Sequence, residues 1–109
     1  MGQYHKLYNL DKKEYVHGHH IGNGLKLMEQ CGHPKSTASA LWLLTANSNG
    51  RASGDAKFNP LIGAWAGNRI LVQGDYADRS DTAFLDPNDA ESFVDISADV
   101  ARMLDSVFK

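Results

Sequence analysis

The chain has 109 residues, of which 42% are hydrophobic and 22% are charged, and this composition predicts one domain over residues 1–109. A formal net charge of −2, without a cluster of lysine and arginine, excludes the electrostatic footprint of a nucleic-acid-binding protein. The single cysteine, Cys31, excludes an internal disulfide framework. Because there is neither an apolar signal core nor a run of about 20 apolar residues, we expect a cytoplasmic protein with no membrane partner.

The first predicted element is a β-hairpin. Residues 4–10 are rich in aromatic and apolar side chains, residues 11–14 form a charged turn, and residues 15–17 lead back. The segment that follows, HGHHIGNG, combines three histidines with three glycines. We therefore expect its backbone to make a tight turn or to pass close to another group.

Two helices are predicted in the middle of the chain. A short one, of about two turns, begins at Asn23 as N-cap and ends at Gly32. A second follows Pro34, with Ser36 or Thr37 in its first turn, and is apolar almost all round over residues 38–47, which predicts a helix covered on two sides. The side chains expected to point inward are Leu25, Leu27, Met28, Leu41, Trp42, Leu43 and Leu44. Residues 51–60 have the composition of a long loop.

Residues 61–78, LIGAWAGNRILVQGDYAD, predict a strand, a turn and a second strand. The turn falls at residues 66–68, where Gly67 and Asn68 are the residue types that most easily take positive φ. The continuous apolar run Ile70-Leu71-Val72 predicts a strand buried on both faces.

The chain closes with a polar connection and a helix. Residues 78–89 are acidic and contain Pro87, with Phe84 and Leu85 as expected anchors. Apolar residues at positions 100, 103, 104, 107 and 108 then form one helical stripe, capped by Asp95 or Ser97. Taken together, these elements predict an α+β fold with a small, mainly antiparallel sheet from two hairpins, packed against about three helices.

Three stretches carry a resemblance: YHKLYNLDKKEYVHGHHIGNGLKLMEQ, IGAWAGNRILVQGDYAD and VDISADV. They resemble a family of small archaeal, bacterial and phage proteins whose shared pattern has NLDK-x-EY, HPH, GLKL-x-E, WAG-D-RI and GDYA segments. The match covers over half of the chain, but Gly18 replaces a proline of the pattern and Asn68 an aspartate. The resemblance implies no activity, and the phage members suggest, by analogy, a host-interaction or counter-defence role.

The histidines of the glycine-rich segment are candidate metal ligands, because imidazole binds zinc, copper, iron and nickel. They are His17, His19 and His20, and a further ligand would come from Asp55, Asp75 or His33. The spacing matches no zinc motif, so the alternative is a set of partly exposed loop histidines. The identity of any metal or other cofactor stays open.

The sequence Gly22-Asn23-Gly24, ahead of a predicted helix that carries Lys26, favours an anion site. Free N–H groups at a helix start and a nearby ammonium attract phosphate. The pattern lacks the third glycine of the dinucleotide fingerprint and the ending of a P-loop, so helix-capping glycines are the simpler interpretation. Arg51 would add a second cation, and Trp65 or Tyr76 would stack on a base.

Asp75 and Asp78 follow a predicted strand, with Tyr76 between them, and are candidate metal ligands or ribose acceptors. Asp75 would serve as a general base if burial raised its pKa. The simpler interpretation is a turn residue. Neither Ser53, which lacks a surrounding G-x-S-x-G, nor Cys31 has the context of a nucleophile.

We therefore expect a non-catalytic binder of a small anionic, nucleotide-like ligand, in the manner of a phage protein that sequesters a signalling molecule. The pocket would form from the glycine-histidine segment and residues 50–55. The residues expected to contact the ligand are His17, His19, His20, Gly22, Asn23, Gly24, Lys26, Arg51, Asp55, Trp65, Asp75 and Tyr76. Two alternatives are a protein-interaction inhibitor module and a metal-dependent hydrolase that uses the histidines and Asp75. A homodimer is also open, since pairing would cover apolar surface.

Overall fold

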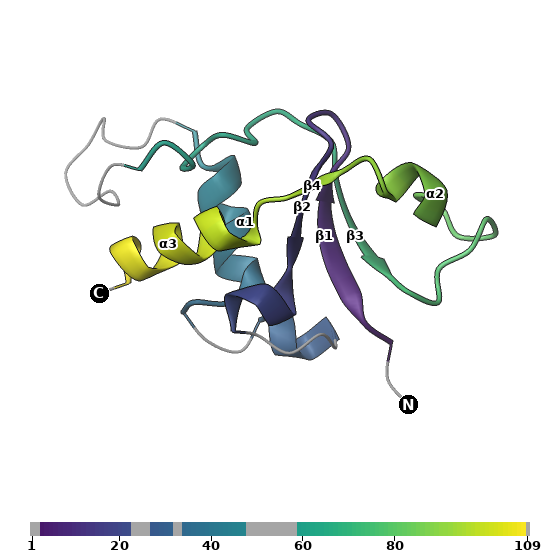
Figure 1. Cartoon of the computed structure of the whole chain (residues 1–109), viewed down its shortest axis with the longest axis horizontal. Coiled ribbons are helices and arrows are strands. Elements are labelled where there is room, and N and C mark those ends of the chain that lie inside the picture. Colours follow the sequence, from purple (N-terminus) through teal and green to yellow (C-terminus); the bar gives the residue numbers. More distant parts are fainter. Residues whose placement is uncertain (1–2, 23–26, 32–33, 48–58, 109) are drawn as a thin grey trace.

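The computed structural model describes residues 3–22, 27–31, 34–47 and 59–108, which contain a four-stranded mixed sheet with the strand order β3-β1-β2-β4 (Figure 1). The central strand β1 (His5–Asn9) pairs antiparallel with β2 (Glu14–His17) on one side and with β3 (Ile70–Gly74) on the other. The short strand β4 (Val94–Asp95) pairs parallel with β2. The predicted α+β fold with a mainly antiparallel sheet is confirmed.

The two longer helices lie on one side of the sheet and a one-turn helix on the other. Helices α1 (Thr37–Thr45) and α3 (Ser97–Val107) flank one face, while α2 (Pro87–Ala90) lies beyond the opposite face (Figure 1). Two short 3-10 helices, η1 (Gly18–Ile21) and η2 (Leu27–Gln30), follow the first hairpin. Among the described residues, no helix has the length and apolar character that crossing a bilayer requires.

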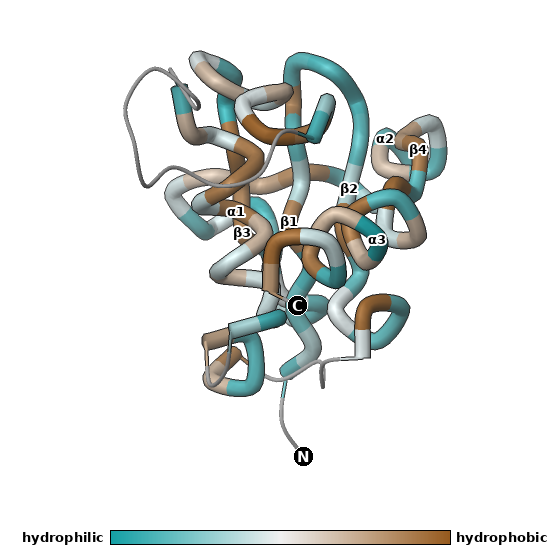
Figure 2. The backbone as a smooth tube through the Cα atoms, turned by 90° about the vertical axis from the view of Figure 1, so that its left-hand side faces the viewer, coloured by the Kyte–Doolittle hydropathy of each residue, from teal (hydrophilic) through white to brown (hydrophobic). Residues whose placement is uncertain are grey.

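The core lies between the sheet and the two longer helices. Alternate strand residues point to opposite faces, so Leu7 of β1 and Val16 of β2 both face the helices and are buried. Apolar stretches of β1, α1 and α3 come together in the middle of the molecule (Figure 2). The remaining buried apolar residues of this core are Ala40, Leu44, Trp65, Ile96, Val100, Met103 and Leu104. Burial of such side chains supplies the main driving force for folding.

The elements with strong local signals form where the sequence predicts them. The first hairpin is confirmed, with a turn at residues 10–13. Helix α1 has Ser36 as N-cap, whose Oγ accepts a hydrogen bond from the Ser39 N–H at 3.2 Å. At the start of α3, the Asp95 carboxylate accepts the Ser97 N–H at 2.8 Å. Val100, Met103 and Leu104 form the buried part of the predicted stripe, whereas Phe108 at its end is 38% exposed.

The second predicted hairpin is wrong, because residues 61–65 form successive turns and not a strand. Their N–H groups have other partners: Gly63 donates to the Leu43 carbonyl at 2.9 Å and Trp65 to the Leu44 carbonyl at 2.8 Å. These carbonyls are at the C-terminal end of α1, where a helix leaves its last acceptors free. Strand β3 consequently pairs with β1 at the edge of the sheet and is not buried on both faces. Gly67 does take positive φ, at 79°, but Asn68 does not.

Three predicted core residues are exposed instead. Trp42 is 79% exposed, because α1 packs by the face that carries Ala40 and Leu44, four residues apart, and Trp42 lies outside it. The predicted two-turn helix is a single 3-10 turn in the described residues, so Leu27 and Met28 are 50% and 76% exposed. Leu25, Asn23 and Gly32 lie outside the described residues, as do residues 51–58 of the predicted loop.

The two tryptophans give a matched test of this packing. Trp65 is fully buried and its indole N–H donates to the Glu14 carboxylate at 2.8 Å, whereas Trp42 is on the surface. We expect Trp65→Phe to lower the free energy of unfolding by about 1–3 kcal/mol, since it leaves the Glu14 acceptor unpaired and a small cavity. Trp42→Phe should stay within about 0.5 kcal/mol of the parent in urea unfolding. Equal losses in the two variants would contradict the packing.

Candidate functional site

The sheet face that points away from α1 and α3, here called the open face, carries an organised set of polar and aromatic side chains. It holds Lys6 and Tyr8 of β1 and Tyr15 and His17 of β2, the residues that alternate with the core positions. The hairpin register puts Lys6 opposite His17 and Tyr8 opposite Tyr15. On the other side of β1, Gln73 of β3 stands opposite Lys6. Five side chains from three strands thus share one surface.

A cavity of about 570 Å³ lies over this surface, and we call it the open-face pocket. Its outer wall comes from the segment between β3 and β4 that includes α2, with Phe84, Leu85 and Phe93 among the lining residues (Figure 1). Gln73 fixes that wall, because its side-chain amide both donates to and accepts from the Leu85 backbone, each at 2.8 Å. The pocket therefore has a rigid floor and a wall held by paired hydrogen bonds.

Aromatic rings form most of the floor and one side. The ring centroids of Tyr8 and Tyr15 are 6.0 Å apart, and the Phe93 ring stands nearly perpendicular to Tyr8 at 5.9 Å. Burial raises the pKa of the Tyr8 phenol, and the neighbouring Tyr15 adds to the rise. Burial also raises the pKa of Tyr15, with a further contribution from the Asp95 carboxylate. Both phenols are therefore neutral donors at physiological pH.

Lys6 is the cation of the pocket floor. Its ammonium lies 5.5 Å from the centroid of the Tyr15 ring, a cation–π distance. Within the described part of the chain the Lys6 ammonium has no carboxylate partner. A positive charge held over an aromatic floor without a counter-ion is available to a ligand anion.

The three histidines adjoin one end of the pocket. His17 lines the pocket and stacks on His20, with ring centroids 4.3 Å apart and planes 18° apart. His20 Nδ1 lies 2.8 Å from the Asp95 carboxylate, and His17 Nδ1 accepts the His19 N–H at 3.2 Å. Because Nδ1 of His17 is an acceptor, its neutral ring carries the proton on Nε2.

Burial and neighbouring groups keep the His17 imidazole neutral near pH 7. Burial lowers the pKa of His17, and the neighbouring His20 and Lys6 lower it further. Burial by itself would raise the pKa of Asp95, but hydrogen bonds from Ser97 and His20 outweigh it, so the pKa lies below its usual range. The arrangement is an anionic Asp95, a His20 bound to it, and a neutral His17 that faces the pocket.

In the described residues, the three histidines do not form a group that could hold a metal, and His20 lies beside the Asp95 carboxylate. Within those ranges, no three side chains of histidine, cysteine, aspartate or glutamate come close enough to hold one ion. Asp55 and His33, two of the three ligands suggested to complete the site, lie outside the described residues. The metal prediction stays a prediction.

The other predicted ligand-contacting residues are dispersed. Asp75 lies at one end of the pocket and accepts the Tyr4 N–H at 3.0 Å. Tyr76 is 63% exposed outside the pocket, and Trp65 is a core residue, so neither can stack on a ligand there. Gly22 ends η1 with a φ of 87°. The rest, Asn23, Gly24, Lys26, Arg51 and Asp55, lie outside the described residues.

Several pocket residues were absent from the predicted set: Lys6, Tyr8, Tyr15, Gln73, Phe84 and Phe93. Four of the pocket's side chains occur as alternate residues of one hairpin, at positions 6, 8, 15 and 17. The alternation of side chains along the correctly predicted hairpin would therefore have been enough to predict the floor of the pocket. The wall depends on a long-range contact between Gln73 and residue 85, for which the sequence has no local signal.

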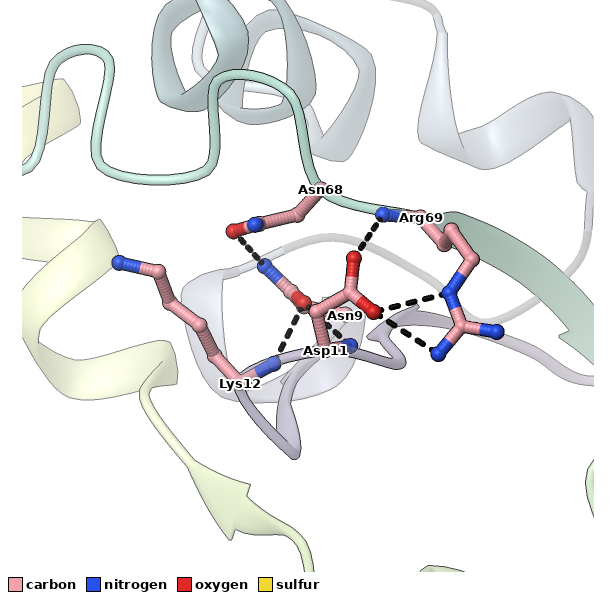
Figure 3. A network of polar contacts seen from close by, with 5 residues as sticks. All are labelled: Asn9, Asp11, Lys12, Asn68 and Arg69. Atoms are coloured by element: carbon pink, nitrogen blue, oxygen red, sulfur yellow. Dashed lines mark hydrogen bonds and ion pairs between the residues drawn. The ribbon is translucent and has the colours of Figure 1, made fainter.

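Residues of the first hairpin and of the segment before β3 meet in a network of polar contacts (Figure 3). Asn9 is fully buried; its amide oxygen accepts the N–H groups of Asp11 and Lys12 at 3.0 and 2.9 Å, and its amide nitrogen donates to Asn68 at 3.0 Å. The Asp11 carboxylate accepts the Arg69 N–H at 2.7 Å and the Arg69 guanidinium at 2.8 Å. These hydrogen bonds from Arg69 lower the pKa of Asp11.

This network joins the first hairpin to the segment before β3. Asn68 serves there as a hydrogen-bond acceptor for the Asn9 amide. These contacts therefore stabilise the fold in this region. Comparison of the chain with protein-family models, with curated proteins and with solved structures finds no match.

The lowered pKa of His17 predicts a specific dependence of stability on pH. Below the ordinary histidine pKa of about 6.5, the unfolded chain binds a proton more readily than folded His17 does. Stability is therefore lost as the pH falls through the ordinary histidine pKa of about 6.5, and this loss should be smaller in His17→Gln. His19→Gln, at an exposed site, should keep the parent's dependence in urea unfolding. The same pH dependence in His17→Gln as in the parent would show that His17 is not perturbed.

Proposed function

We propose that this protein binds a small aromatic molecule with one anionic group in the open-face pocket. The observation that carries the proposal is the combination of Lys6, which has no carboxylate partner among the described residues, and two tyrosines on the floor of a 570 Å³ cavity. Small-ligand sites have volumes of roughly 300–1,000 Å³ and combine apolar walls with a few placed polar groups. The proposal keeps the nucleotide-like ligand expected from the sequence and assigns it to the sheet face.

The aromatic part of the ligand would lie among the rings. Tyr8, Tyr15, Phe84 and Phe93 all line the pocket. Stacking between a base and an aromatic side chain contributes about 1–3 kcal/mol per base and tolerates different bases, because every base has a π-face. These rings favour a flat, conjugated ligand over an aliphatic one.

The anionic group would lie beside Lys6 and His17. Their backbones are opposite each other in the hairpin register, so an ammonium and an imidazole N–H donor occupy neighbouring positions. Hydrogen bonds to a charged partner contribute about 1.5–3 kcal/mol, more than those between neutral groups. A phosphate or carboxylate oxygen fits this pair.

Two carboxylates of the pocket limit the charge of the ligand. Asp75 at one end and Glu91 on the wall both line the cavity. They would repel a second anionic group and accept hydrogen bonds from amino or hydroxyl groups of the ligand. The pocket therefore favours a nucleoside monophosphate or an aromatic carboxylate over a di- or triphosphate. The proposed activity is binding, as in a protein that sequesters a small signal.

The direct test is thermal unfolding with nucleosides, nucleoside monophosphates and nucleoside triphosphates, each at about 1 mM. Binding to the native state stabilises by about 2.7 kcal/mol when the ligand is at 100 times its dissociation constant. We expect monophosphates to raise the Tm most. Lys6→Met should remove the difference between monophosphate and nucleoside while keeping the response to the nucleoside.

Lys12→Met, at an exposed position of the hairpin turn, is the matched control and should respond as the parent does. Two results would overturn the proposal. One is an unchanged Tm with every aromatic anion. The other is an equal response of Lys6→Met and Lys12→Met to the monophosphate.

A further inference from the structure

Strand β3 ends the sheet and leaves one row of backbone groups without partners. The bonds from Leu10 N–H to the Arg69 carbonyl and from Asp75 N–H to the Tyr4 carbonyl fix which residues bond to β1. In an antiparallel ladder, hydrogen-bonded residue pairs alternate with pairs that are not hydrogen-bonded. The backbone N–H and C=O groups of Leu71 and Gln73 therefore bond to β1, while those of Ile70 and Val72 point away from β1 in the plane of the sheet. Within the described part of the chain, the outward N–H and C=O groups of Ile70 and Val72 have no hydrogen bond.

A groove runs along this free edge. Its volume is about 380 Å³, and it is lined by Gln3, by residues 71–74 of β3 and by residues 76–77 and 81–83 of the segment that follows. The segment after β3 therefore forms a wall beside the strand edge and does not cover it. An extended chain in the groove would find both a hydrogen-bonding edge and a side wall.

An apolar crevice lies on the other side of Val72. It has a volume of about 160 Å³ and is lined by Leu27 of η2, Leu41 of α1 and Val72 itself, among others. Val72 lines both the crevice and the groove and is 49% exposed, although its side chain points toward the helix side of the sheet. A residue paired with Val72 on an added strand would place its side chain on the same face, next to this crevice.

Among the described residues that line the groove, the charged side chain is acidic, and the nearby Arg79 is paired with Asp86. Natural edge strands usually carry a charged residue or proline that blocks further pairing. The sequence Ile70-Leu71-Val72-Gln73-Gly74 has neither. The groove wall carries Asp81, which is exposed, with Asp78 next to it in the same turn. The residues of an added strand that alternate with the apolar one would face this acidic wall.

We propose that the free edge of β3 binds an extended peptide of a partner protein, which adds a fifth strand and has an apolar residue flanked by basic residues. Main-chain hydrogen bonds to Ile70 and Val72 would provide affinity, and the crevice and Asp81 would provide specificity, as in other β-strand additions. The proposal is independent of the ligand in the open-face pocket.

A second copy of this chain is a poorer occupant than a single peptide. Antiparallel pairing of two β3 strands places the two-fold axis perpendicular to the sheet, so both copies present their open faces on the same side. The wall formed by residues 76–83 of each copy would then lie at the same interface between the two strands. A free peptide has no such wall and fits between the strand edge and the wall already present.

The test is binding of labelled peptides to the full chain by fluorescence anisotropy. The probes alternate lysine with valine, glutamate with valine, or lysine with N-methylated valine, whose backbone lacks the N–H groups needed for pairing. We expect the lysine–valine peptide to bind at least about tenfold more tightly than either other probe. Equal binding of the N-methylated peptide would overturn strand addition, and no binding of any probe would overturn the proposal entirely.

Three protein variants localise the site. Val72→Lys should weaken the lysine–valine peptide by about tenfold or more, while Val94→Lys, an exposed valine on the opposite edge strand, should leave its binding unchanged. Asp81→Asn should weaken this peptide but not an analogue with glutamine in place of lysine. Equal effects of Val72→Lys and Val94→Lys would refute the site. Sedimentation would show whether the parent is a dimer. A dimer that Val72→Lys dissociates would contradict peptide binding and show that the occupant of the edge is a second copy of this chain.

Discussion

The pairing of β1 with strands on both of its sides is the constraint on which the rest of the structure depends. Because side chains alternate along a strand, the register that buries Leu7 beneath the helices also puts Lys6 and Tyr8 on the open face. A shift by one residue would exchange the two sets. The hydrophobic core and the candidate pocket are therefore two results of one hydrogen-bonding pattern, and a change that disturbs the core also displaces the floor of the pocket.

Polar contacts hold this pattern in register. The buried amide of Asn9 satisfies the hairpin turn and reaches Asn68, while the Trp65 indole donates to Glu14 of β2. Both contacts join the first hairpin to the segment that precedes β3, about 55 residues later in the chain. Leaving a buried donor or acceptor without a partner costs about 1–3 kcal/mol, so these contacts disfavour alternative pairings of β3.

Local patterns predicted the elements whose partners are near in sequence, and failed where distant partners decide. The first hairpin, α1 and α3 each have a turn, cap or apolar stripe of their own. Residues 61–65 have the sequence pattern of a strand, but the N–H groups of Gly63 and Trp65 donate to the free carbonyls at the end of α1. Trp42 was expected in the core because an apolar helix does not reveal which face packs. Of the candidate site, His17 and Asp75 were predicted. Tyr8 was missed although it alternates with Lys6 in the predicted hairpin, whereas Phe93 was missed because the wall of the pocket depends on long-range contacts.

The open face and the free edge of β3 suit different kinds of partner, a flat small molecule on one and an extended chain on the other. The central claim is that the open face is the small-molecule site. Its most direct measurement is an amide ¹⁵N–¹H NMR titration with nucleoside monophosphates. The account predicts shift changes concentrated at Lys6, Tyr8, Tyr15, His17 and Phe93. Changes confined to residues outside this face, or none with any monophosphate, would contradict it.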